Sequence, residues 1–183
     1  MNLAPIAAKH GSDKCSWHSY GPVYDRMFDG KTVRKVLEIG IGYKGLLAES
    51  YENAASLRMW AEYFPEAQIY GLDIRPDALV NEGRIHSFQC NQGKVASLLA
   101  AREAVGWGFD LVVDDGSHQP EHQILTACVF WPVMALGGRY VIEDVASTEE
   151  VAPFLPFKNE VIDLKTGKIE DDRLIVSYDI TRP

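Results

Sequence analysis

The sequence predicts an α/β fold, a Rossmann-like three-layer sandwich in which an antiparallel hairpin closes a mostly parallel seven-stranded sheet. Three observations predict this class. Short apolar runs rich in β-branched residues recur along the chain. Segments with apolar residues at helical spacing separate these runs, and two further runs stand close together near the end. No shift in composition divides the 183 residues, so we expect a single domain over residues 1–183.

The elements follow from this pattern in order. Residues 1–30 are expected to form an amino-terminal helical arm that covers the site, broken near Gly11 and resumed after Tyr20. Five strands are expected over residues 34–42, 68–74, 84–90, the first half of 109–118, and 140–142. Helices should lie between them, with Ile124, Leu125, Cys128 and Trp131 on the buried side of the helix that Pro120 opens. Runs 161–164 and 174–178, with a turn near 166–168, predict the closing hairpin.

Composition excludes several classes of function. The formal net charge is −8, the pI is near 5.1 and no block of Lys and Arg occurs, so we expect no nucleic-acid partner. The first residues lack the charged-then-apolar layout of a signal peptide, and no apolar run approaches membrane-spanning length, so we expect no membrane partner. Three widely spaced cysteines are typical of a cytoplasmic protein with reduced thiols. The sequence leaves a homo-oligomer open.

Acidic residues follow two of the predicted strands. Asp115 and His118 come after the strand in residues 109–118, and Glu143 and Asp144 follow the strand 140–142. Carboxyl ends of parallel strands meet at one edge of the sheet, where ligands bind. Carboxylates crowded together repel unless a cation neutralises them. The sequence therefore predicts a divalent metal beside a general base.

A second pattern predicts a nucleoside ligand. Gly40 and Gly42 end the first strand, where glycine lets the backbone approach a ligand closely. Asp73 ends the second strand and could bond both ribose hydroxyls. Asn91 and Gln92 follow the third strand, and the amide of Asn91 could both donate to and accept from an adenine edge. Each feature alone has another explanation: a plain turn, a solvated strand end, or an Asx turn at Asn91.

Taken together, these motifs resemble the class I S-adenosylmethionine-dependent methyltransferases. More narrowly, the sequence is similar to the magnesium-dependent sugar O-methyltransferases that act on macrolide antibiotics, a group related to cephalosporin hydroxylase-like sequences. The resemblance covers most of the chain, from about residue 10 to residue 144. Its motifs are Gly11-Ser12-Asp13-Lys14, Glu38-x-Gly40-x-Gly42, Ser56-Leu57-Arg58-Met59-Trp60, Tyr70-Gly71-Leu72-Asp73, Asp114-Asp115-Gly116-Ser117-His118 and Glu143-Asp144.

The resemblance implies a role for each matching position. S-adenosylmethionine and Mg²⁺ would be the cofactors, and His118 would be the catalytic base. The metal ligands would be Asp115, Glu143 and Asp144. One departure is that Cys90-Asn91-Gln92 stands where the family usually has Gly-Asp-Gln. The residues expected to line the S-adenosylmethionine site are Glu38, Gly40, Ile41, Gly42, Tyr43, Ser56, Asp73, Asn91, Gln92 and Asp115.

The expected function is therefore magnesium-dependent transfer of a methyl group from S-adenosylmethionine to a hydroxyl of a sugar, glycoside or oligosaccharide. The alternatives are a methyltransferase of a catechol-like or other small diol, and a non-catalytic nucleoside-binding module of the same fold. A nicotinamide dehydrogenase is weakened because the third glycine of its fingerprint is missing. A two-histidine metal pair, His118 with His122, also stays open.

Other residues near these motifs have two interpretations each. His10 and His18 either help to close the site or lie at the surface. Trp17, Tyr20 and Tyr24 form either a wall for sugar stacking or part of the core. Asp114 is expected to cap backbone amides or orient its neighbours, and the acids at 170–172 are expected to form a solvated turn.

Overall fold

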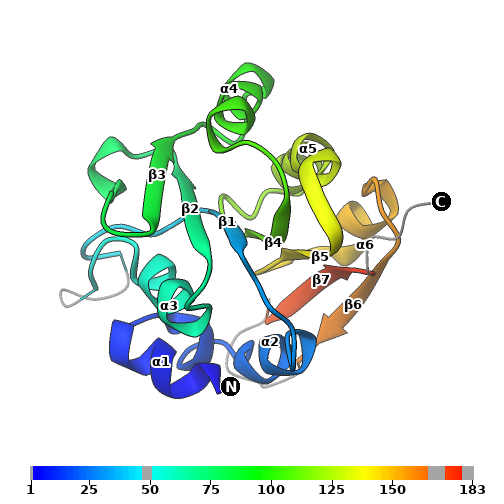
Figure 1. Cartoon of the computed structure of the whole chain (residues 1–183). Coiled ribbons are helices and arrows are strands. Elements are labelled where there is room, and N and C mark those ends of the chain that lie inside the picture. The colour runs from blue at the N-terminus through cyan, green and yellow to red at the C-terminus, as the bar shows by residue number, and fades with distance from the viewer. Residues whose placement is uncertain (1, 47–50, 165–171, 179–183) are drawn as a thin grey trace.

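A single seven-stranded sheet organises the computed structural model, which describes residues 2–46, 51–164 and 172–178. The spatial order of the strands is β3-β2-β1-β4-β5-β7-β6 (Figure 1). Strands β1 to β5 run parallel, and β7 is antiparallel to both β5 and β6. This arrangement confirms the predicted fold class. The strands are β1 (Lys35–Ile39), β2 (Gln68–Asp73), β3 (Ile85–Gln89), β4 (Phe109–Asp114), β5 (Met134–Ile142), β6 (Asn159–Asp163) and β7 (Arg173–Ser177).

Helices cover both faces of the sheet, as Figure 1 shows. One face packs against α1 (Leu3–His10), α2 (Gly21–Met27) and α3 (Ala55–Tyr63). The other packs against α4 (Val95–Val105), α5 (Pro120–Phe130) and α6 (Thr148–Val151). None of the helices in the described ranges is long and apolar enough to cross a membrane.

The central strands are apolar on both faces because each face is covered. Leu111 and Val113 of β4 pack into the core beneath α1 to α3, whereas Val112 between them packs into the core beneath α4 and α5. All three side chains are fully buried. Continuous apolar runs of this kind are typical of parallel strands buried on both sides, which is why the sequence pattern located them.

The buried face of α5 differs from the prediction. Polar Gln123 and Thr126 face the core, and Cys128, which we expected to be buried, is exposed. The two polar side chains can be buried because each is hydrogen-bonded: Thr126 Oγ1 donates to a carbonyl oxygen at 2.8 Å, and Gln123 Nε2 donates to the carbonyl of Glu143 at 3.4 Å. The prediction is thus confirmed for Ile124, Leu125 and Trp131, which pack partly buried against the core, and is wrong for Cys128.

Strand β5 also begins earlier than predicted. Gly137 and Gly138, expected to end the preceding helix, lie within the strand. A Cβ on Gly138 would stand 2.8 Å from the carbonyl oxygen of Phe109, at the point where the pairing of β4 with β5 shifts register. The close approach requires glycine there, so the glycine pair marks a bulge in the strand.

Candidate active site

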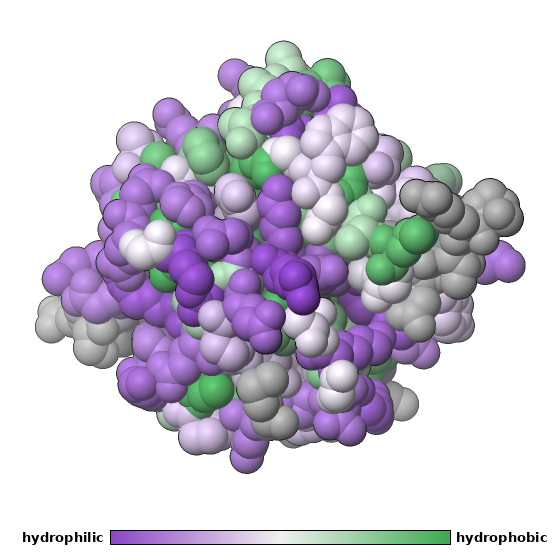
Figure 2. Space-filling view, viewed as in Figure 1, coloured by the Kyte–Doolittle hydropathy of each residue, from purple (hydrophilic) through white to green (hydrophobic). Residues whose placement is uncertain are grey.

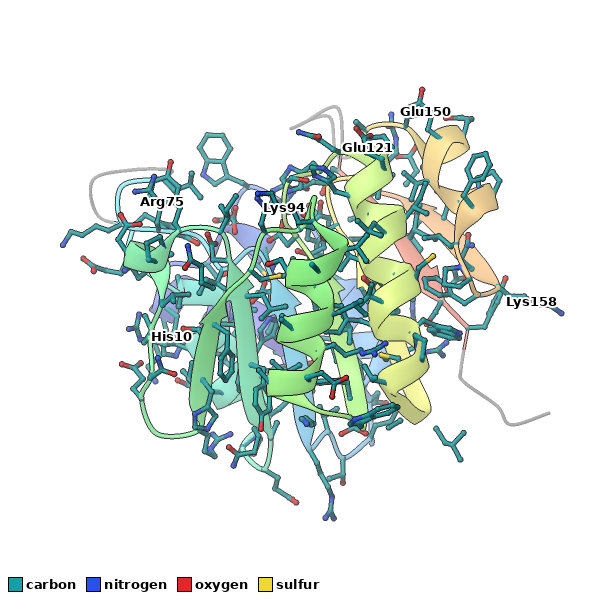
Figure 3. The ribbon with its side chains drawn as sticks, turned by 90° about the horizontal axis from the view of Figure 1, so that it is seen from above. His10, Arg75, Lys94, Glu121, Glu150 and Lys158 are labelled. Atoms are coloured by element: carbon teal, nitrogen blue, oxygen red, sulfur yellow. The ribbon has the colours of Figure 1, made fainter. Side chains whose placement is uncertain are left out.

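A cavity of about 630 Å³ opens at the carboxyl ends of β1 to β5. This volume lies within the usual range for small-molecule sites. In Figure 3, Arg75, Lys94 and Glu121, which follow the carboxyl ends of β2, β3 and β4, lie along the same edge of the molecule. Nearly all of the predicted site residues line this cavity. Those in its wall are Gly40, Ile41, Gly42, Tyr43, Ser56, Asp73, Asn91, Gln92, Asp115, His118 and Asp144.

The glycine loop after β1 packs directly against the loop after β4. Gly40 has φ +80°, and a Cβ at this position would lie 2.0 Å from the carbonyl oxygen of Asp115. Gly42 has φ +68°, and a Cβ there would lie 2.5 Å from the hydroxyl oxygen of Tyr51. Both positions require glycine for conformation and for space. The loop predicted to hold the cofactor therefore also fixes the backbone of a predicted metal ligand.

Asp73 ties the end of β2 to this loop. Its Oδ2 accepts a hydrogen bond from the backbone N–H of Ile41 at 3.1 Å, and its Oδ1 accepts from that of Arg75 at 2.9 Å. The guanidinium of Arg75 lies 4.0 Å from the ring centroid of Tyr43. Across the loop, Ser56 Oγ donates to Glu38 Oε2 at 2.7 Å. Glu38 is fully buried and is not in the cavity wall, unlike the other predicted cofactor residues.

The residues after β3 bond mainly within the chain. Asn91 Oδ1 accepts from the backbone N–H of Gly93 at 3.0 Å, the contact expected of an Asx turn. Gln92 Nε2 donates to Asp114 Oδ1 at 2.7 Å, and its Oε1 accepts from the N–H of Ser117 at 2.9 Å. Asp114 thus orients its neighbours as predicted, and burial raises its pKa to about 7. Gln92 joins the ends of β3 and β4 and so supports the loop that bears Asp115.

Asp115, His118 and Asp144 converge at one end of the cavity, and we call these three residues the outer cluster. His118 Nε2 lies 3.3 Å from Asp115 Oδ1 and 3.6 Å from Asp144 Oδ2. His118 and Asp144 both have a left-handed backbone, with φ +58° and +50°. Non-glycine residues seldom adopt this conformation, and it is frequent at functional sites. The structure therefore brings together residues that are far apart in the sequence, as predicted.

The acids of the outer cluster control the charge on its imidazole. Burial disfavours the protonated ring, but the hydrogen bond and charge of Asp115, together with the charge of Asp144, outweigh burial and raise the pKa of His118 to about 9. Burial and the charge of Asp115 raise the pKa of Asp144. Burial also acts to raise the pKa of Asp115, but the cations Lys14 and His118 overcome it and hold that pKa below its usual range.

A buried lysine, which we did not predict as part of the site, lies directly behind the outer cluster. Lys14, in the 3₁₀ helix Asp13–Cys15, is only 1% exposed. Its Nζ lies 2.7 Å from Asp115 Oδ2 and 3.0 Å from Glu38 Oε1, and it donates a short hydrogen bond to Glu143 Oε2. We call the acids around it, Glu38, Asp115 and Glu143, the inner cluster. Burial acts to lower the pKa of Lys14, but the three acids outweigh it and raise that pKa well above its ordinary value.

Glu143, a predicted metal ligand, belongs to this inner cluster. Its second oxygen, Oε1, accepts from the hydroxyl of Tyr24 at 2.6 Å, so both oxygens have a donor within the chain. Burial raises the pKa of Glu143 well above its ordinary value, although the charge of Lys14 opposes this effect. The carboxylate lies beside the outer cluster but is directed towards the lysine.

The aromatic residues of the arm divide between core and surface. Tyr20 is buried, and its hydroxyl donates a short hydrogen bond to Asp144 Oδ1. His18 stacks on the Tyr20 ring at 4.6 Å, and its Nδ1 lies 3.2 Å from Asp144 Oδ1, so this histidine lies in the site. Trp17 is 60% exposed. Asp172 is buried, with Oδ1 3.5 Å from His18 Nδ1, so its predicted place in a solvated turn is wrong; residues 170 and 171 lie outside the described ranges.

Two groups of side chains in the described ranges could hold a metal ion. They are the outer cluster and the inner cluster, and within each the ligand atoms lie within 4.8 Å of one another. Carboxylate oxygens in this number suit a hard cation such as Mg²⁺. His122 is in neither group, and its Nδ1 lies 2.8 Å from Ser117 Oγ. The geometry thus favours an acid-based site over the two-histidine pair.

Comparison with known proteins gives several relatives of one kind, although no protein-family model matches the chain. The chain is 38% identical over 151 residues to 8-demethyl-8-(2-methoxy-alpha-L-rhamnosyl)-tetracenomycin-C 3'-O-methyltransferase of Streptomyces olivaceus. This match covers 79% of the chain and 37% of that protein. The chain is 38% identical over 148 residues to mycinamicin VI 2''-O-methyltransferase of Micromonospora griseorubida, covering 79% and 36%. The chain therefore spans well under half the length of these relatives.

Solved structures give the same result. The MycE methyltransferase in complex with Mg, SAH and mycinamycin VI has a TM-score of 0.69 and 36% identity, covering 79% of this chain and 37% of that one. The N-methyltransferase NodS of Bradyrhizobium japonicum WM9 has a TM-score of 0.56 and 15% identity over 97% of both chains, which shows a shared fold alone. These findings confirm the resemblance seen in the sequence. Over 79% of its length, the chain is therefore similar to O-methyltransferases of which it spans less than half.

Proposed function

We propose that this chain transfers a methyl group from S-adenosylmethionine to a hydroxyl of a sugar or glycoside, with Mg²⁺ in the outer cluster. The observation that carries the proposal is the position of Asp115, His118 and Asp144 at one end of a cavity whose remaining wall contains the glycine loop and Asp73. A cofactor held by the loop would lie beside an acceptor held at the acids. This proximity is a large part of what a transferase contributes.

The cofactor half would lie along the ends of β1, β2 and β3. Ile41, Gly42 and Tyr43 line the cavity at the glycine loop, and Asp73 lies across from them. The oxygens of Asp73 already accept two backbone N–H groups, which fixes the carboxylate for bonding to a ribose. The related MycE structures contain SAH, which supports this assignment.

The metal half would be held mainly by Asp115 and Asp144. The fit rests on their chemistry, because two acids meet here at the cavity wall. Burial and the charge of Asp115 raise the pKa of Asp144, and a divalent cation would relieve the repulsion between the two carboxylates. A bound Mg²⁺ would supply Lewis-acid chemistry, orienting an acceptor and lowering the pKa of its hydroxyl. Direct coordination by Glu143 stays a prediction, because both of its oxygens already have donors.

His118 would act as the general base. Its ring is partly exposed, it lines the cavity, and its Nε2 lies within 3.6 Å of both acids. An acceptor oxygen held by an ion at these acids would therefore lie near Nε2. Nε2 takes the proton of the acceptor hydroxyl as the oxygen attacks the methyl carbon. The carbon–sulfur bond breaks, its electron pair stays on sulfur, and S-adenosylhomocysteine is released. A neutral imidazole is needed at the start of this step.

The acceptor class and the cellular place are inferred from the family and the composition. Relatives named for O-methylation of rhamnosyl tetracenomycin-C support a sugar-containing acceptor. Cys15, Cys90 and Cys128 are all free thiols, which is compatible with the cytoplasm. Figure 2 shows a mostly hydrophilic face on which apolar residues form small separate groups.

A methyl-transfer assay tests the proposal. The protein is incubated with S-adenosylmethionine and a panel of free sugars, glycosides, oligosaccharides and a catechol, with Mg²⁺ or with EDTA, and products are detected by mass spectrometry. We expect methylated glycoside with Mg²⁺ and none with EDTA. Preference for the catechol would favour the small-diol alternative, and turnover that survives EDTA would remove the metal from the mechanism. Calorimetric binding of NAD but not of S-adenosylhomocysteine would refute methyl transfer.

A further inference from the structure

We propose that Lys14 is a built-in counter-cation that occupies the inner cluster and so confines the divalent ion to the outer cluster. This role makes Lys14 a positioning residue: it acts on the reaction through the acids and does not touch the acceptor. The inference rests on the proposed function in one respect, because it takes the outer cluster as the metal site.

The first argument is the placement of the ammonium. Lys14 Nζ lies within 3.0 Å of one oxygen from each of Glu38, Asp115 and Glu143. The ammonium donates hydrogen bonds to the oxygens of Asp115 and Glu143 and faces that of Glu38 as an ion pair. The same three acids form one of the two groups able to hold a metal. An ion among those oxygens would need the space that Nζ fills.

The second argument is charge. Three buried carboxylates without a cation would repel one another strongly, and burial makes each charge expensive. Lys14 removes part of that charge without a ligand from solution, which explains why a lysine, normally exposed, is 1% exposed here. The inner cluster is therefore already compensated before any ion arrives.

The third argument is how Asp115 divides its two oxygens. Oδ2 faces Lys14 at 2.7 Å, and Oδ1 faces His118 at 3.3 Å. One carboxylate thus belongs to both clusters, with its inner oxygen held by the ammonium and its outer oxygen turned to the cavity. Lys14 also contributes through its backbone, because its carbonyl accepts the N–H of Tyr20, whose hydroxyl bonds to Asp144. The ammonium therefore orients Asp115, whereas only the backbone of residue 14 supports Tyr20 beside Asp144.

The test measures Mn²⁺ binding, with Mn²⁺ as the probe, by electron paramagnetic resonance and calorimetry. Wild type should bind one ion per chain, and Asp144→Asn should weaken this at least about tenfold, the scale for disturbed metal sites. Lys14→Met opens the inner cluster, so the double variant Lys14→Met/Asp144→Asn should regain one ion per chain. Lys9→Met, which removes an exposed lysine of the same arm, is the matched control and should behave as wild type.

Three outcomes decide the proposal. A folded double variant that binds no more Mn²⁺ than Asp144→Asn would overturn it. Lys14→Met could be unfolded in EDTA, and circular dichroism would then show whether Mn²⁺ restores the fold. Folding on addition of Mn²⁺ would support the proposal, and a chain that stays unfolded with Mn²⁺ would overturn it. Wild type that binds no Mn²⁺ would refute the metal in the proposed function, whereas a gain of Mn²⁺ in Lys14→Met would still support the role of Lys14.

Discussion

Binding of Mg²⁺ should release a proton from His118. In the metal-free protein, Asp115 and Asp144 raise the pKa of His118 to about 9, so at pH 7.5 the ring is about 97% protonated. A divalent ion between the two acids cancels the charge that holds this proton. If the pKa returns to its ordinary value near 6.5, only about 9% of the rings stay protonated. The expected release is therefore about 0.9 proton per ion bound.

Isothermal titration calorimetry measures this release directly. Mg²⁺ is titrated at pH 7.5 into protein in buffers of different ionisation enthalpy, such as Tris and PIPES, and the slope of the observed enthalpy gives the number of protons. His118→Asn should lose about 0.9 proton from this slope relative to wild type. His86→Asn, whose ring on β3 lies near Gln68 and outside the cavity wall, is the control and should release as much as wild type.

The reasoning would be refuted if wild type and His118→Asn released the same number of protons. That result would mean that the ion leaves the charge around the imidazole unchanged, so it would have to bind away from the outer cluster. A base that stayed protonated with the ion bound could not accept the proton of the acceptor hydroxyl.

Three further predictions concern the loops and acids of the site. Gly40→Ala should lower the free energy of unfolding by about 1–3 kcal/mol and weaken Mg²⁺ binding, because its Cβ would stand 2.0 Å from the Asp115 carbonyl oxygen. Gly45→Ala is the control, because Gly45 has a similar φ but no atom within 4 Å of the added Cβ, and it should lower the free energy of unfolding less. Equal losses for the two variants in urea titrations would contradict the close-packing argument. Glu143→Gln should weaken Mg²⁺ binding less than Asp115→Asn does in calorimetry; the reverse order would make Glu143 a direct ligand. The metal-free protein should lose stability as the pH rises from about 6.5 through about 9, because the pKa of His118 in the folded state lies above its value in the unfolded state. Urea titrations of His118→Asn should show a smaller change of stability with pH than wild type does, and an equal change would show that His118 is not responsible.

The fold was predictable because its strands carry a local signal. Strands buried on both faces favour continuous apolar runs, and Leu111, Val112 and Val113 of β4 show this directly. The acids follow these runs in the sequence, so the outer cluster could be placed once the strands were placed. The order of strands then brought Asp115 and Asp144 to neighbouring ends, since β4 pairs with β5.

The errors arose where tertiary contacts decide the outcome. Gln123 and Thr126 are buried in α5 because distant or adjacent carbonyls accept their hydrogen bonds, and no apolar count can detect that. The glycine pair in β5 serves as a bulge because of an approach by the backbone of Phe109, which the sequence does not show.

Lys14 was missed for a similar reason. Its partners Asp115 and Glu143 are 101 and 129 residues away in the chain, and lysine is seldom buried. The available signal was its place in the Gly11-Ser12-Asp13-Lys14 motif, which contributed to the resemblance but gave no role. His18 carried even less signal, because its contact with Asp144 depends on the arm folding over the sheet edge.

Anomalous diffraction from crystals grown with Mn²⁺ and S-adenosylhomocysteine would test the central claim most directly. We predict one strong peak between Asp115 and Asp144, at about 2.0–2.2 Å from a carboxylate oxygen of each, with His118 Nε2 beside it and the sulfur of the cofactor facing it across the cavity. A peak elsewhere, or these two carboxylates turned to opposite sides of the protein with no ion between them, would contradict it.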